Sequence, residues 1–326
     1  MAYREIAARE DAQTARELFN ACVRAGEVLY KPFDDIEAFE AFFLRRPKEE
    51  ATVVNLLWED GSAFASGCHV EATGKCYITF VAVSPAKRRQ GRGREILAGL
   101  ERRLKELSHG SAAACEIIFF NPMNLSWFLP GTAGHDHPNA PGVDVSGGAY
   151  LFFKNCGYRD YVYQNSYHIE LTDYSFPEDI RQRISALKEK GIEITLYDSA
   201  AHTGLEELME NLGNATWTRD ILGNAALPGG GNPLLIVNRE GRAMGFAGPM
   251  SVQESGRGYF SGIAVHSDCR GMGAGKVLFS SLCGSLRDMG ARFMTLFTGE
   301  TNPARNIYEA AGFHIVRTWA DMKKAI

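Results

Sequence analysis

Two segments of the 326-residue chain combine basic side chains with glycines at a spacing suited to binding an anion. The first is VSPAKRRQGRGREIL, residues 83–97, and the second is VHSDCRGMGAGKVLF, residues 265–279. Arg88, Gly91 and Gly93 in the first segment match Arg270, Gly273 and Gly275 in the second. A loop that recurs in the same frame predicts that both halves of the chain have the same local structure.

The chemistry of such a loop is phosphate binding. Glycine lets backbone N–H groups approach a pyrophosphate closely, and a following helix adds the positive end of its dipole. Neighbouring arginines and Lys276 add charge-assisted hydrogen bonds. The alternatives are a nucleic-acid patch and a solvated start of a helix, but a net charge of −4 argues against attraction to nucleic acid.

Two better-known phosphate motifs do not fit these segments. The Walker form GxxxxGK[ST] needs a hydroxyl residue after its lysine, whereas Val277 follows Lys276 and Arg270 stands where the first glycine belongs. The dinucleotide form GxGxxG fails at Lys276, and the antiparallel strands expected before the loop do not suit a parallel βαβ unit.

The elements that position the two loops recur with them. Each loop lies between a strand rich in β-branched and aromatic residues and a helix with apolar residues at helical spacing. A further strand follows, and then a short helix that ends at Gly and an aromatic residue. In chain order, we expect these elements at 75–84, 94–108, 115–120 and 150–158, and again at 259–266, 276–290, 292–298 and 306–313.

A strand, a glycine loop of the form [RQ]xxGx[GA] and a downstream helix of the form Tyr-xxx-Gly-aromatic resemble the GNAT superfamily of acyl-CoA-dependent N-acetyltransferases. The resemblance covers about residues 1–170 and 192–326. It implies an α+β fold with two tandem GNAT-like domains, as in mycothiol synthases, each a mixed, mostly antiparallel sheet flanked by helices. We expect domains at 1–171 and 192–326, a linker at 172–191, and an ordered loop inserted at 121–148.

The resemblance also implies a binding site for acetyl-CoA in each half. The cofactor contacts carried over to the second half are Val265, Arg270, Gly271, Met272, Gly273, Ala274, Gly275 and Lys276, with Asn302 beside the family's usual position. Those carried over to the first half are Val83, Arg88, Arg89, Gln90, Gly91, Arg92, Gly93 and Arg94.

The resemblance further assigns the reacting groups to the second half. Tyr308 occupies the place of the residue that protonates the departing thiolate, whereas the first half has Phe153, which carries no proton to donate. Glu300 and Glu254 are alternative general bases, and a strand N–H near Val265 would stabilise the oxyanion.

The inserted loop carries polar residues of its own, namely His135, Asp136, His137 and Asp144. We expect them to line the acceptor side of a cleft, where carboxylates favour a cationic amine. The alternatives are a metal site and a loop that merely folds on itself. The family's chemistry needs no metal, so we expect none.

Composition limits the remaining functions. Hydrophobic residues make up 45% and charged residues 23%, as in a globular protein, and no apolar run of about 18 residues occurs. Seven cysteines without CxxC spacing favour a reducing cytoplasm. We expect a cytoplasmic N-acetyltransferase that uses acetyl-CoA and a small-molecule primary amine, without nucleic-acid or membrane partners. Acetylation of protein N-termini or lysines, and a non-catalytic acyl-CoA-binding regulator, are the alternatives.

Overall fold

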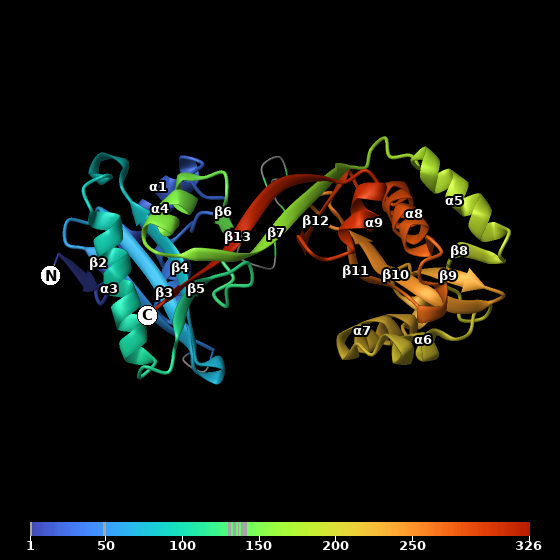
Figure 1. The fold of residues 1–326 in the computed structure, drawn as a ribbon, viewed down its shortest axis with the longest axis horizontal. Helices are drawn as coiled ribbons and strands as arrows, with labels where there is room; N and C mark the ends of the chain where they lie inside the picture. The colour runs from blue at the N-terminus through green and yellow to red at the C-terminus, as the bar shows by residue number, and fades with distance from the viewer. Residues whose placement is uncertain (1, 48–49, 130–131, 133–134, 136, 138–141) are drawn as a thin grey trace. The chain divides into compact units, whose positions relative to one another are not determined.

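The computed structural model describes residues 2–47, 50–129, 132, 135, 137 and 142–326. These residues form two compact units (Figure 1). The first unit comprises the chain up to Gln164 together with Thr318–Ile326, and the second comprises Asn165–Arg317.

The first unit contains strands β1 to β6 and helices α1 to α4. Their bounds are β1 Tyr3–Glu5, α1 Arg9–Arg24, α2 Ile36–Phe43, β2 Thr52–Trp58, β3 Ala63–Val70, β4 Lys75–Val83, α3 Arg92–Leu107, β5 Ala114–Ile117, β6 Val143–Asp144 and α4 Gly148–Asn155. β1 to β4 pair antiparallel in sequence order, and β5 pairs parallel with β4. Single turns of 3₁₀ helix, Glu71–Thr73 and Pro85–Lys87, flank β4.

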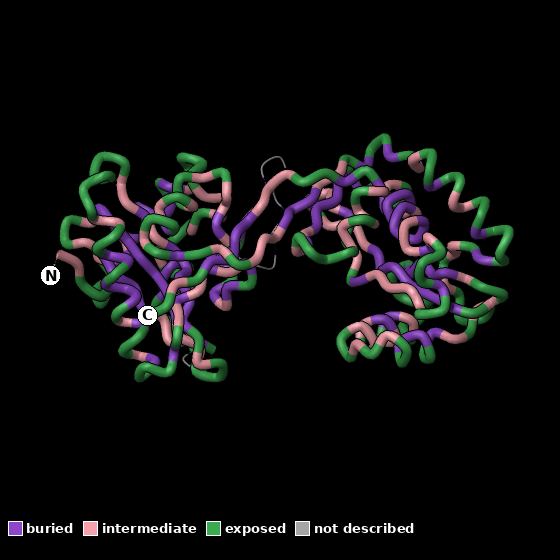
Figure 2. Tube along the Cα trace, viewed as in Figure 1, coloured by how far each residue is buried: buried purple, intermediate pink, exposed green. Residues whose placement is uncertain are grey.

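The sheet of the first unit has helices on both faces because its strands alternate large apolar residues. Leu56 packs in one core with Ile96 and Leu100 of α3, while its neighbour Leu57 packs in another with Phe19 of α1. Strands β3 and β4 are buried along most of their length (Figure 2). The period of two along the strands thus builds two cores from one sheet.

The second unit repeats this order of elements. Strand β7, Arg159–Glu170, leads into it, and its elements are α5 Glu178–Lys188, β8 Ile192–Leu196, α6 Leu205–Leu212, α7 Ala215–Ala225, β9 Leu235–Arg239, β10 Arg242–Val252, β11 Gly258–Val265, α8 Ala274–Asp288, β12 Phe293–Gly299 and α9 Arg305–Ala310. Strand β13, His314–Ala325, ends the chain. β8 to β11 pair antiparallel in sequence order, with 3₁₀ turns at Pro228–Gly230 and Ser267–Cys269.

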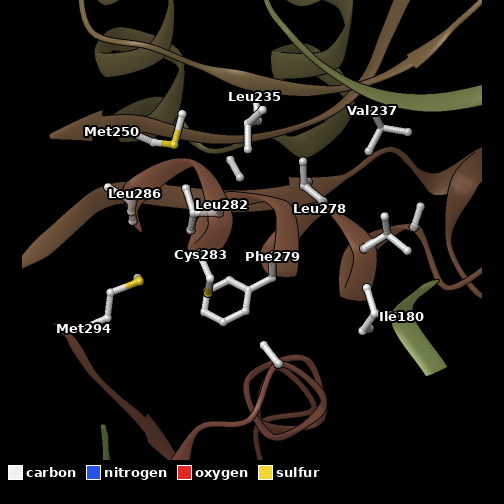
Figure 3. Close-up of a cluster of buried hydrophobic side chains, with 14 of the residues drawn as sticks. Ile180, Leu235, Val237, Met250, Leu278, Phe279, Leu282, Cys283, Leu286 and Met294 are labelled. Carbon is white, nitrogen blue, oxygen red and sulfur yellow. The ribbon is translucent and has the colours of Figure 1, made fainter. Parts of the chain in front are cut away.

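Helix α8 forms the centre of the second core. Its residues Leu278, Leu282 and Leu286 face β9 and β10, where Leu235, Val237 and Met250 lie (Figure 3). The opposite face of these strands packs Ile236 and Phe246 against α6 and α7. The expected fold class, an α+β chain with two tandem domains of mostly antiparallel strands flanked by helices, is confirmed.

The last strand of the chain does not stay with the second unit. The strand order is β1-β2-β3-β4-β5-β13-β7-β12, so β13 lies between β5 and β7. Met322 pairs with Ile117 of β5, and Lys324 donates to Glu101 of α3 at 2.6 Å. Residues 318–326 therefore complete the sheet of the first unit.

The structure divides the chain differently from the expected 1–171, 172–191 and 192–326. β7 carries Tyr167 into the core of the second unit, where Leu171 also lies. The expected linker contains α5, whose Ile180 and Leu187 are buried in that same core. The segment 172–191 is thus part of the second unit, since its apolar face packs there.

Candidate functional site

The two glycine loops adopt the same backbone conformation. Gly91 (φ 84°) is the N-cap residue of α3, and Gly273 (φ 83°) is that of α8. Two residues earlier a positive φ occurs again, at Arg89 (61°) in the first loop and at Gly271 (76°) in the second. This conformation suits glycine and costs a residue with a side chain about 1–2 kcal/mol. The two loops are therefore structural repeats, and only the second is built without this strain.

One arginine in each loop turns back to the preceding strand. Nε of Arg88 donates to the carbonyl of Val83 at 2.9 Å, and Nε of Arg270 donates to the carbonyl of Val265 at 3.2 Å. These bonds fix the start of each loop against the end of its strand. A terminal nitrogen of Arg88 also donates to Glu27, whereas Arg270 makes no other hydrogen bond to a described residue.

The last glycine of each loop permits close packing against the short helix. A Cβ on Gly93 would lie 3.2 Å from the ring of Phe152, and one on Gly275 would lie 3.4 Å from Cδ1 of Ile307. Phe152 and Ile307 directly precede Phe153 and Tyr308. These glycines thus bring the short helix, and with it Tyr308 in the second unit, close to the loop.

The backbone amides of the second loop are free to bind an anion. The N–H groups of Gly271 to Gly275 donate to no acceptor among the described residues, and no side chain caps α8. They surround the positive end of the helix dipole. Open amides and glycines fit a pyrophosphate, so these residues suit the cofactor that the sequence predicts.

Two arginines of the first loop, Arg88 and Arg92, are paired with carboxylates of the first unit. Arg88 donates to both carboxylate oxygens of Glu27 at 2.7 Å. Arg92 donates to both oxygens of Asp60, at 2.8 and 2.6 Å, and stacks over Trp58 at 5.2 Å. Hydrogen bonds from Arg92 and Ser62 lower the pKa of Asp60 to about 2. Two carboxylates therefore offset part of the positive charge of this loop.

The cations of the second loop are not paired in this way. Arg270 and Lys276 form no ion pair with any residue that the structure describes. Nearby Asp268 instead lies 3.6 Å from Nδ1 of His266. The second loop therefore keeps both its open amides and its positive charge, which favours a phosphate ligand there.

Tyr308 lies on α9 behind the last glycine of the second loop. Its ring packs against Phe279 at 4.9 Å and Tyr167 at 6.1 Å between ring centres. Burial raises the pKa of Tyr308, so the phenol is protonated at neutral pH. Its hydroxyl has no hydrogen bond to another described residue. A protonated hydroxyl without a protein partner is suited to donate to a ligand.

The counterpart of Tyr308 in the first unit is a packing residue. Phe153 on α4 is buried, and its ring meets Tyr158 at 5.4 Å and Phe152 at 5.1 Å. It has no proton-donating group. The short helix α4 of the first unit thus matches α9 of the second unit in structure but lacks the proton-donating hydroxyl.

Strands β11 and β12 separate immediately after they meet. They share one parallel bridge, between Arg257 and Phe293, and then belong to different sheets. Arg257 lies at this junction and donates to the carbonyl of Thr295 at 2.8 Å, and burial lowers its pKa to about 10. β11 is consequently an edge strand in its own sheet, with main-chain groups available beyond the junction.

The direction of these strands shows which of the two expected general bases lies at the same end as Val265. Because β11 and β12 run parallel from their junction, Val265 and Glu300 lie toward the same end. Glu254 lies in the hairpin before β11, and at about 3.3 Å per residue the strand separates it from Val265 by roughly 20 Å or more. Asn302 accepts the N–H of Ala304 at 3.0 Å, so its oxygen caps the turn before α9.

The polar residues of the inserted loop serve its own packing where they are described. Oδ1 of Asp144 accepts the N–H and the hydroxyl of Ser146, at 2.9 and 2.6 Å. His135 and His137 are 2% and 5% exposed, and His137 stacks on Trp127 at 4.2 Å. Asp136 lies outside the described residues. The three described residues thus sit in turns and an aromatic cluster.

The start of the inserted loop covers the end of β4. Asn121 donates to the carbonyl of Ile78 at 3.1 Å, which joins the chain beyond β5 to β4. Met123 and Leu125 are buried in one core with Phe80. The first unit therefore fills, with its own side chains, the region beside its diverging strands.

Arg183 lies beside the second loop, although it comes from α5. A Cβ on Gly273 would be 3.3 Å from its Nη1 and 3.7 Å from its Cδ. The sequence does not predict that Arg183 lies beside the second loop, because the two are about 90 positions apart. Only the packing of α5 against α8 brings Arg183 to the loop.

Other features of the structure lie away from these residues. A cavity of about 320 Å³ lies between β1, β2 and the end of α2, and touches none of the expected site residues. Within the described ranges, no three His, Cys, Asp or Glu side chains are grouped to hold a metal ion. Over the same ranges, no helix has the length and apolar character needed to cross a membrane.

The chain was compared with known protein families and curated proteins. The sequence profile of the acetyltransferase (GNAT) family matches twice, at residues 13–122 and 202–313. Each match contains one glycine loop. No curated protein matched the chain.

Solved structures similar to this chain include three with related names. One is a GCN5-related N-acetyltransferase from Sphaerobacter thermophilus, at 16% identity and a TM-score of 0.57, covering 99% of this chain and 96% of that one. A second is the glucosamine N-acetyltransferase region of a fungal multi-domain GH3 beta-N-acetylglucosaminidase, at 15% identity and a TM-score of 0.58, covering 99% of this chain and 38% of that one. A third is a tandem GNAT protein from the clavulanic acid biosynthesis pathway, at 13% identity and a TM-score of 0.53, covering 99% of this chain and 98% of that one. At these identities the likeness shows the fold.

Proposed function

The chain belongs to the acetyltransferase (GNAT) family, and from this premise we propose that it transfers the acetyl group of acetyl-CoA to a primary amine of a small molecule, at a site in the second unit. One observation carries the proposal. The second unit alone combines open loop amides, cations without ion pairs and a protonated tyrosine hydroxyl. In the first unit, Arg88 and Arg92 are paired with carboxylates, and Phe153 takes the place of the tyrosine.

In the proposed site, each group of the second loop has a separate task. The N–H groups of Gly271 to Gly275 bind the pyrophosphate, and Arg270 and Lys276 add charge to it. The edge of β11 up to Val265 orients the arm of the cofactor. When bound, acetyl-CoA supplies an acetyl thioester.

The reacting groups lie at the ends of β12 and α9. Tyr308 donates its phenolic proton to the departing sulfur, and the raised pKa keeps that proton in place until transfer. Glu300 removes the proton of the amine, directly or through water, because it lies at the same end of the diverging strands as Val265. A main-chain N–H near Val265 stabilises the carbonyl oxygen as charge develops on it.

A structurally similar protein supports a small-molecule acceptor. One structurally similar protein is named a glucosamine N-acetyltransferase, which acts on a small amine, and we extend that class to this chain. The free hydroxyl of Tyr308 supports turnover over a regulator that only binds acyl-CoA.

The two loops provide a matched test of the site. Gly273→Glu adds a side chain at a positive φ and a negative charge among the open amides, so it should abolish acetyl-CoA binding. Gly91→Glu makes the same change in the first loop and should leave binding intact. Calorimetry with both variants and the unaltered protein measures stoichiometry and affinity. Binding that survives Gly273→Glu, or that is lost in Gly91→Glu, would refute the assignment to the second unit.

The acceptor requires a separate assay. Release of free thiol from acetyl-CoA, followed with a panel of amino sugars, small amines and lysine peptides, should show turnover with small amines. Turnover with peptides alone would replace this acceptor class with protein acetylation.

A further inference from the structure

Arg183 occupies a place at the second loop that the family resemblance does not assign. Its Nη1 would lie 3.3 Å from a Cβ on Gly273, the N-cap residue of α8. The guanidinium therefore stands beside the backbone amides that have no protein acceptor.

The position of Arg183 is fixed by packing. Helix α5 packs on α8, and its Ile180 lies in the core of the second unit (Figure 3). Leu187 of the same helix is also buried in that core. The side chain extends from this anchored helix, and 42% of it is exposed. The helix backbone is thus anchored, while the side chain can reach a ligand bound at the loop.

The donors of Arg183 are largely unused. Its Nε lies 3.6 Å from Oδ2 of Asp179, which is too long for a hydrogen bond, and that buried nitrogen has no acceptor in the described structure. An exposed pair of this kind on one helix contributes little stability. The guanidinium thus has free donors facing a loop built for an anion.

The charges around the second loop are unbalanced. Arg183 lies beside Gly273, and Arg270 and Lys276 belong to the same loop and the first turn of α8, while Asp179 is the carboxylate nearest to Arg183 in its ion pair. In the first loop, by contrast, Glu27 and Asp60 pair with Arg88 and Arg92 at 2.7 and 2.6 Å. Unpaired cations beside open amides are typical of a phosphate site.

We propose that Arg183 binds a phosphate group of the acyl-CoA through its terminal nitrogens, and so sets the affinity of the second unit for the nucleotide part of the cofactor. This inference rests on the proposed function. The group recognised is either the pyrophosphate or the 3′-phosphate, which share the same chemistry.

Binding measurements distinguish contact with the pyrophosphate from contact with the 3′-phosphate. Arg183→Gln, which removes the charge and keeps a polar side chain, should weaken acetyl-CoA binding about 10-fold or more, as expected for a lost charge-assisted hydrogen bond. Arg183→Lys should lose less, because it keeps the charge. Arg181→Gln is the control on the same helix, since Arg181 is exposed and bonds to Glu178. Calorimetry with acetyl-CoA and 3′-dephospho-acetyl-CoA, at two salt concentrations, gives the affinities.

Each result has a defined meaning. A loss in Arg183→Gln that is confined to acetyl-CoA supports contact with the 3′-phosphate, and an equal loss for both ligands supports contact with the pyrophosphate. Both ligands binding Arg183→Gln within about 2-fold of the unaltered protein would overturn the inference alone. Absence of binding by the unaltered protein would overturn the proposed function as well. An unchanged Tm in Arg183→Gln excludes a purely structural role.

Discussion

At the scale of single residues, Tyr308 and Phe153 show what separates the two units. They hold matching places on short helices, and both rings pack against aromatic neighbours. They differ by one hydroxyl, which in Tyr308 is protonated and has no hydrogen bond to another described residue. The difference therefore concerns chemistry and leaves packing nearly unchanged.

Tyr308→Phe should lower kcat by about 100-fold or more, since general acid catalysis contributes roughly 10²–10⁴-fold. The affinity for acetyl-CoA should change by less than about 3-fold, because only a transition-state interaction is removed. Steady-state kinetics and calorimetry measure the two effects. Phe153→Tyr is the control and should change neither. Parallel losses of kcat and affinity would instead show Tyr308 to be a packing residue.

The sequence was sufficient to predict residues whose role depends on local geometry. Gly91 and Gly273 were singled out because glycine lets the backbone approach a phosphate closely, and the structure adds that both have a positive φ. Arg183, Glu27 and Asp60 were missed. Each acts across a tertiary contact, so no spacing in the chain marks it.

At the scale of elements, the expected strands and helices are present with shifted ends. Helices α3 and α8 begin two residues before the expected 94 and 276, directly after the capping glycines. The strand expected at 115–120 ends at Ile117, where the chain diverges from β4. Such ends depend on caps and partner strands, which hydrophobic periodicity does not encode.

The junction of β5 and β13 contains a buried carboxylate that should make stability depend on pH. Asp321 accepts the N–H of Phe119 at 2.7 Å, and burial raises its pKa to about 6. The unfolded chain has a value near about 3.9. The folded state thus favours the protonated form, so the penalty for burying the charge is small at pH 4, grows as pH rises toward 6 and levels off above that pH.

Asp321→Asn removes this titration and keeps an acceptor for Phe119. Relative to the unaltered protein, the variant should gain up to about 3 kcal/mol in unfolding free energy between pH 4 and pH 7.5. Denaturant unfolding at both pH values, followed by tryptophan fluorescence, measures the change. A difference between the two proteins that is the same at both pH values would contradict this origin.

At the scale of the whole molecule, the main feature is the course of β13. Trp319, Ala320 and Met322 are buried, and they belong to the first unit although they follow the whole of the second in the chain. The repeat in the sequence predicted two tandem domains but not this pairing. An apolar strand has the same sequence pattern whichever sheet it joins, so hydrophobic periodicity does not specify its partner strand.

Deleting residues 318–326 should unfold the first unit. Burial of a large apolar side chain contributes about 1.5–3 kcal/mol, so losing Trp319 and Met322 removes a large part of the 5–15 kcal/mol typical of a domain. The deletion also leaves Glu101 without Lys324. Hydrogen exchange should show lost protection in β2 to β5, while α8 stays protected. A peptide of residues 314–326 should restore protection, and full protection in the truncated chain would show that the first unit is stable without β13.

The pairing of β5 with β13 also has a consequence for biosynthesis. Met322 leaves the ribosome 205 residues after its partner Ile117. At 5–20 residues per second, β5 waits about 10–40 s for its neighbour, far longer than a hairpin takes to form. For that time the nascent chain presents an unpaired strand edge to chaperones and to other nascent chains. Translation speed over the second half of the message should therefore influence how much of the protein reaches its native fold.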